Sequence, residues 1–165
     1  MSARARAAAG TLAFLVVAPG VVAGLIPYLL TGWEADGDVP VVAVLAGWLL
    51  IAAGLAALLA SFARFALEGI GTPAPVAPTE HLVVTGLYRY VRNPMYLAVA
   101  ALIVGQALLL GHPELLLYAL AFGAAVLAFV RGYEEPALTR RFGAEYEAYR
   151  SAVPGWWPRL RPWSP

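Results

Sequence analysis

The stretch from residue 85 to residue 96, T-G-L-Y-R-Y-V-R-N-P-M-Y, decides how the rest of this chain can be arranged. It holds two Arg, three Tyr and an Asn-Pro pair directly before an apolar run. A second polar group, R-G-Y-E-E at residues 131–135, ends the next apolar run. If the two runs form a helical hairpin, both polar groups lie at the same end of it, and we expect a functional site there.

The composition is typical of an integral membrane protein. Of the 165 residues 61% are hydrophobic and 13% are charged, and the mean hydropathy is +0.73, all outside the range of soluble domains. The absence of Cys excludes disulfides, thiolate metal sites and a Cys nucleophile. His81 and His112 have no partners at ligand spacing, so no metal site is predicted. The net charge of +1 argues against binding to nucleic acid.

Four apolar runs are predicted to cross the membrane as helices, at about residues 9–31, 41–63, 93–110 and 114–131. Each is close to the roughly 20 residues that span the hydrocarbon core. Pro19 and Pro27 are expected to kink the first run, because proline removes an amide donor. Gly47 and Gly54 are expected to let a neighbouring helix approach the second run closely. We therefore predict an all-α polytopic fold in a single membrane domain over residues 1–165.

Apolar and aromatic side chains recur every three or four residues beyond the fourth run. They are Leu138, Phe142, Tyr146, Tyr149 and Val153. Charged residues lie between them, which predicts one amphipathic helix at the membrane interface. The tail that follows Pro154 is rich in Trp and Arg and is expected at the depth of the lipid headgroups.

The charges divide cleanly between the two sides of such a four-span arrangement. All eleven Arg fall on one side. The other side holds Glu34, Asp36, Asp38, His112 and Glu114. Because basic residues favour the cytoplasm, both termini and both polar groups are predicted to be cytoplasmic in a multi-pass protein of the cell (inner) membrane.

The polar residues by themselves leave several interpretations open. Arg89 and Arg92 can serve as snorkelling anchors or as contacts to lipid phosphates, and the three neighbouring Tyr can form an aromatic belt. Glu134 and Glu135, directly after a span, need compensation from Arg131 or from a cationic ligand. Alternatively, the two acids favour the N-terminus of the helix that follows.

The combination of motifs resembles the isoprenylcysteine carboxyl methyltransferase and phospholipid methyltransferase superfamily. The resemblance covers about residues 79–158: G-L-Y-R-Y-V-R-N-P-M-Y, a span, a short turn, a span, E-E, and L-x-x-x-F-G-x-x-Y-x-x-Y-x-x-x-V-P. It implies S-adenosyl-L-methionine as the cofactor, bound near the cytosolic face. It also implies an amphiphilic acceptor that reaches the site from the bilayer, with this half of the chain as the catalytic half.

The resemblance further implies which residues bind the cofactor. These are His81, Gly86, Tyr88, Arg92, Asn93, Pro94, Tyr96, Glu134 and Glu135. A carboxylate suits the ammonium and hydroxyl groups of the cofactor, and Arg suits its carboxylate. Consecutive helical residues point about 100° apart, so one of the two Glu is expected to face the ligand directly. Arg131 and Tyr96 are the catalytic candidates, which would orient the acceptor.

The acceptor itself is not predicted. Asn93 stands where prenylcysteine enzymes usually have His, and Ala98 replaces a common Gly, so a prenylcysteine-like carboxylate and a phospholipid-type amine both stay open. O-, N- and S-methylation are therefore not distinguished, and neither is the oligomeric state. Two other functions compete with this one. The first is an NADPH-dependent membrane enzyme similar to the sterol reductases, and the second is a non-catalytic membrane scaffold.

Overall fold

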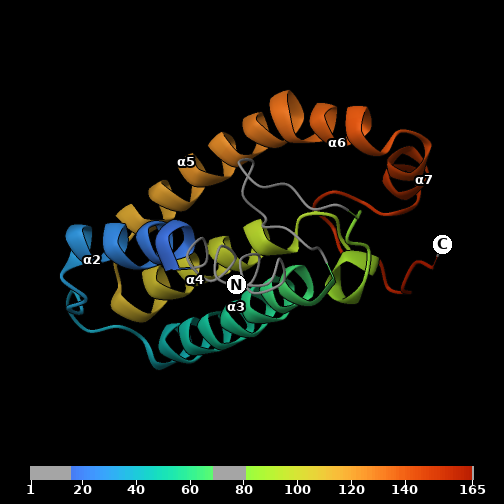
Figure 1. The fold of residues 1–165 in the computed structure, drawn as a ribbon. Coiled ribbons are helices and arrows are strands. Elements are labelled where there is room, and N and C mark those ends of the chain that lie inside the picture. The colour runs from blue at the N-terminus through green and yellow to red at the C-terminus, as the bar shows by residue number, and fades with distance from the viewer. Residues whose placement is uncertain (1–15, 69–80, 165) are drawn as a thin grey trace, which may run out of the picture.

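The computed structural model describes residues 16–68 and 81–164, and these residues form helices and loops without any strand (Figure 1). The predicted all-α class is confirmed for this part of the chain. Two of its helices, Val41–Arg64 and Glu114–Phe142, are long and apolar enough to cross a membrane. Val16–Thr31 and Pro94–Leu110 are shorter apolar helices. The first predicted span starts at residues that lie outside the described ones.

The helices α3 (Val41–Glu68) and α4 (Pro94–Leu110) form the most extensive contact between elements in the described structure. They run antiparallel and side by side (Figure 1). A Cβ atom on Gly47 would lie 2.7 Å from the carbonyl oxygen of Gly105, and one on Gly54 would lie 2.9 Å from that of Ala98. The close approach predicted for the small residues of α3 is therefore confirmed, because no larger side chain fits there.

The helix α5 (Glu114–Phe129) returns alongside α4 after a short turn, as the hairpin prediction requires. Gly111 ends α4 in the left-handed region with φ of 75°, and its amide donates to the carbonyl oxygen of Ala107. The helix does not stop at residue 131. It continues through η3 (Val130–Glu134) into α6 (Glu135–Phe142), so that both glutamates lie on one long helix with α5.

Two widened π-helical turns interrupt otherwise regular helices, each two residues before a proline. The first, η1 (Val21–Leu25), precedes Pro27 in α2 (Ile26–Thr31), and the second, η3, precedes Pro136. In each case the amide after the turn bonds to the carbonyl five residues earlier, as from Glu135 to Val130. Proline crowds the preceding turn and lacks an amide, and a wider turn relieves that crowding.

The C-terminal helix is not the single element that the periodicity predicted over residues 138–153. Gly143, with φ of 51° and ψ of −124°, separates α6 from α7 (Ala144–Ala152). This conformation is open to glycine and costly for other residues. Tyr146 and Tyr149 are buried in a cluster with Val153, so the apolar stripe packs on protein.

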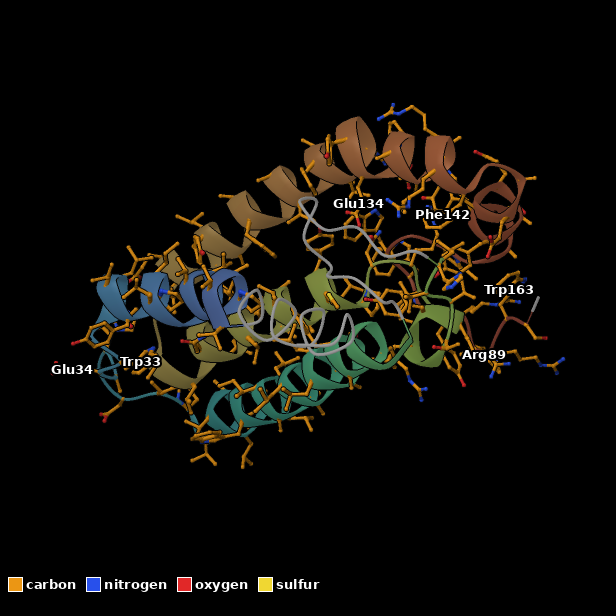
Figure 2. The ribbon with its side chains drawn as sticks, in the orientation of Figure 1. Trp33, Glu34, Arg89, Glu134, Phe142 and Trp163 are labelled. Carbon is orange, nitrogen blue, oxygen red and sulfur yellow. The ribbon has the colours of Figure 1, made fainter. Side chains whose placement is uncertain are left out.

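The tail beyond α7 folds back along the segment that leads into α4 (Figure 1). The amide of Arg92 donates to the carbonyl of Pro154, the amide of Arg159 to that of Tyr90, and the amide of Trp163 to that of Arg89. Figure 2 shows Arg89 and Trp163 next to each other in this region. Through these bonds the tail connects the end of the predicted catalytic half with the segment near its beginning.

Candidate active site

The loop that begins the site is shaped by its glycine and proline residues. Gly86 opens the turn η2 (Gly86–Arg89) with φ of 57°, and a Cβ atom there would lie 3.0 Å from the Nε of Arg64. Pro94 occupies the first turn of α4, where a missing amide costs no hydrogen bond. Asn93 precedes it, is buried, and donates from Nδ2 to the carbonyl oxygen of Gly155 at 3.0 Å. These contacts place the motif between the C-terminal tail and α4.

A cavity of about 690 Å³ lies between the start of α4 and the long helix of α5 and α6. Its polar lining comes mainly from the two predicted motifs and from α6 and α7. These residues are Tyr88, Arg92, Asn93, Tyr96, Tyr133, Glu134, Glu135, Arg140, Arg141, Tyr146 and Tyr149. Its apolar lining includes Ala18, Pro19, Val22, Leu58, Phe62, Met95, Val99, Phe122, Phe129, Leu138 and Phe142. The cavity is thus polar in one part and apolar in another.

Arg92 connects the first motif with the second and with α7. Its Nη1 donates to Glu135 Oε1 at 2.7 Å and to Tyr146 Oη at 3.1 Å, and its Nε donates to the carbonyl oxygen of Val153 at 2.9 Å. Arg150 Nη2 lies 3.1 Å from the other oxygen of Glu135. The side chains of Arg92 and Glu135 are each only 14% exposed, so this ion pair is largely shielded from solvent.

The two glutamates have different partners. Glu134 accepts a hydrogen bond from Tyr96 Oη at 3.1 Å, whereas Glu135 is held by two arginines. Figure 2 shows Glu134 directed from the long helix toward the interior of the molecule. The π-helical turn brings both carboxyl groups to the cavity wall. Among the described residues Glu134 has fewer partners than Glu135, which makes Glu134 the better candidate to bind a ligand.

Three buried tyrosines line the cavity. Burial raises the pKa of Tyr88, Tyr146 and Tyr149 above the usual value for a phenol. Each is therefore neutral at physiological pH and can donate a hydrogen bond. Tyr149 Oη donates to the carbonyl oxygen of Tyr88 at 2.7 Å, which fixes α7 against the loop of the first motif.

The structure brings most of the predicted site residues together. Those that line the cavity are Tyr88, Arg92, Asn93, Pro94, Tyr96, Glu134 and Glu135. Gly86 shapes the adjoining turn. His81 is exposed and is not a lining residue. Arg131 is also exposed and does not line the cavity. It lies in an adjoining groove of about 360 Å³, which shares Glu135 and Arg140 with the cavity wall. The cofactor-binding and catalytic roles of all these residues stay predictions.

Sequence reasoning missed several residues of the cavity wall. Their spacing places Leu138, Phe142 and Tyr146 on one apolar face of the predicted interfacial helix, and in the structure these three residues line the cavity. The contribution of Ala18 and Val22 was also missed, because no local motif links the first helix to the site. Only the tertiary arrangement places it there.

The comparisons with known proteins agree with these motifs. A family model described as phospholipid methyltransferase matches residues 42–145, which is more than half of the chain and includes both polar motifs. The resemblance predicted from the motifs is confirmed by this match. No curated protein and no solved structure matches the chain significantly.

Proposed function

The chain belongs to the phospholipid methyltransferase family, and we propose that it is an S-adenosyl-L-methionine-dependent methyltransferase with a lipophilic or amphiphilic acceptor. The acceptor is a prenylcysteine-like carboxylate or a phospholipid-type amine. One observation carries the proposal: a single cavity combines the carboxyl groups of Glu134 and Glu135 with an apolar lining from several helices. Such a cavity can hold a polar cofactor and an apolar tail side by side.

The residues of the polar part fit the proposed cofactor. The volume of about 690 Å³ lies within the range of roughly 300–1,000 Å³ that is usual for small-molecule sites. Glu134 offers a carboxylate to an ammonium or hydroxyl group, and Phe142 and Leu138 offer apolar surface to a flat ring. When bound, S-adenosyl-L-methionine supplies an electrophilic methyl group on a positively charged sulfur.

The protein needs mainly to align the reactants and to exclude water. Tyr96 fixes the carboxyl group of Glu134 through its hydroxyl, and Arg92 fixes that of Glu135. A carboxylate acceptor needs no general base. An amine acceptor must lose a proton during the transfer.

We further propose a multi-pass arrangement in the cell (inner) membrane, with four spans and with the site and both termini in the cytoplasm. The support is the one-sided distribution of Arg and the position of both motifs at one end of the hairpin. The chain has no Cys, so Asp36→Cys and Arg159→Cys each give one labelling site. An impermeant maleimide should label them from opposite sides of the membrane. Labelling of both from the same side would contradict the topology.

Ligand stabilisation tests the cofactor. We expect S-adenosyl-L-homocysteine to raise the Tm of the purified protein in mild detergent, because a ligand that binds only the folded state stabilises it. NADPH serves as the control. Stabilisation by NADPH instead would favour an enzyme similar to the sterol reductases, and no effect of either ligand would favour a non-catalytic scaffold.

A further inference from the structure

The first helix, Val16–Thr31, forms one wall of the apolar part of the cavity. Ala18, Pro19 and Val22 line this part together with Phe122 of α5. Phe122 lies about twelve residues before Glu134 on one continuous helix, which corresponds to roughly 18 Å at about 1.5 Å per residue. A ligand whose headgroup lies at the glutamates would therefore reach this wall only with an extended apolar tail.

The described residues give this helix little other packing. Among the described elements it packs chiefly against α4. Most of its large apolar side chains are exposed, namely Val16, Val17, Val21, Leu25, Leu29 and Leu30. Its position relative to α5 therefore depends on a small number of specific contacts.

The π-helical turn in this helix changes the hydrogen bonding of two carbonyl groups. The amide of Ile26 bonds to the carbonyl oxygen of Val21, whereas in a regular helix it would bond to that of Val22. Pro27 has no amide to offer to the carbonyl oxygen of Ala23, which is its usual helical partner. The carbonyls of Val22 and Ala23 therefore need hydrogen-bond donors from outside the helix backbone.

Side chains of two neighbouring helices supply these donors. Tyr118 Oη of α5 donates to the carbonyl oxygen of Val22 at 2.8 Å. Gln106 Nε2 of α4 donates to the carbonyl oxygen of Ala23 at 2.8 Å, and Gln106 Oε1 accepts from Trp33 Nε1 at 3.0 Å. In a bilayer no water competes for such carbonyls, so the two bonds pin the turn next to the cavity wall.

We propose that Gln106 and Tyr118 are positioning residues that determine which acceptor tails the enzyme accepts, a role that rests on the proposed function. By holding the π-helical turn, they hold Ala18, Pro19 and Val22 at the apolar part of the cavity. Neither residue lines the cavity, so neither touches the reacting groups. Their loss should alter the shape of the apolar part of the cavity and leave its polar part intact.

A distance measurement tests, without relying on catalysis, whether these two hydrogen bonds hold the first helix in position. Gly20→Cys and Gly123→Cys provide spin-label sites in open space on the first helix and on α5 in a Cys-free chain. Tyr118→Phe and Gln106→Leu should broaden or shift the distance distribution in nanodiscs. Tyr28→Phe, which removes the same hydroxyl from an exposed position of the first helix, should leave it unchanged. An unchanged distribution in the first two variants would overturn the proposal.

A kinetic measurement tests the consequence for acceptors. The probes are cysteines with geranyl, farnesyl or geranylgeranyl tails, and phosphatidylethanolamines with short or long acyl chains. In the series that the wild type methylates, we expect the ratio of kcat/KM between long and short tails to change roughly 3- to 20-fold in Tyr118→Phe and Gln106→Leu, the range of interhelical hydrogen bonds in membranes. The KM for S-adenosyl-L-methionine should stay unchanged.

The outcomes separate this proposal from the proposed function. A wild type that neither binds S-adenosyl-L-homocysteine nor methylates either series would overturn both. A wild type that methylates, with variants that keep its tail preference, would overturn only the role of Gln106 and Tyr118. If Tyr28→Phe changes the tail preference as well, the effect comes from general destabilisation, and this outcome would also overturn the role of Gln106 and Tyr118.

Discussion

Glu134→Gln should weaken cofactor binding, because this carboxyl group accepts a single hydrogen bond from the described residues. That bond comes from Tyr96 Oη at 3.1 Å, and Glu134 lines the cavity. A hydrogen bond to a charged group contributes about 1.5–3 kcal/mol. The Kd for S-adenosyl-L-homocysteine should therefore rise roughly 10- to 150-fold, at about 1.4 kcal/mol per factor of ten. The unfolding temperature without ligand should change little.

Glu135→Gln should act differently, because Glu135 is held by Arg92 at 2.7 Å and by Arg150 at 3.1 Å. Gln keeps an oxygen acceptor but loses the charge that strengthens both contacts. The difference between a charged and a neutral hydrogen bond is about 1–1.5 kcal/mol, and Arg92 would also keep a largely shielded charge without its partner. We expect the main effect of Glu135→Gln to be a lower free energy of unfolding, by about 1–2 kcal/mol, rather than weaker ligand binding.

Titration calorimetry in detergent gives the Kd of both variants, and thermal unfolding without ligand gives their stability. Glu145→Gln makes the same chemical change at an exposed position of α7 and serves as the matched control. Equal affinity for S-adenosyl-L-homocysteine in wild type and Glu134→Gln would refute the assignment of Glu134. A larger affinity loss in Glu135→Gln than in Glu134→Gln, with unchanged stability, would assign the ligand contact to Glu135 instead.

Two further predictions concern parts of the molecule away from the cavity. Gly105→Ala should destabilise the protein by about 1–3 kcal/mol, because its Cβ would lie 2.8 Å from the side chain of Ile51, whereas Gly123→Ala, in open space, should not. Unfolding in detergent compares the two. The hydrogen bond to Glu114 raises the pKa of His112, so their contact should stabilise the fold below pH about 6.5 and be lost as pH rises through the raised value. The Tm difference between wild type and His112→Gln should accordingly shrink toward alkaline pH, and a constant difference would contradict it.

Much of the site could be predicted because its chemistry is concentrated in two short motifs at the ends of apolar runs. The length of each run and the short turn at residues 111–113 require an antiparallel hairpin, and a hairpin brings Arg92 and Glu135 to the same end. The resemblance, confirmed by the family match, added the proposed cofactor. The partners of each polar group could not be predicted, because they come from the tail and from α7, far along the chain.

The amino-acid sequence by itself determined the helical class, the hairpin and the pairing of the two motifs, since these follow from local composition and from the spacing of apolar residues. Only the tertiary structure decided that, among the described residues, Glu134 is held by one tyrosine and Glu135 by two arginines. It also decided that Gly143 breaks the last helix and that the first helix joins the cavity. The physical reason is that these features depend on contacts between distant segments, and no local pattern of residues specifies such contacts.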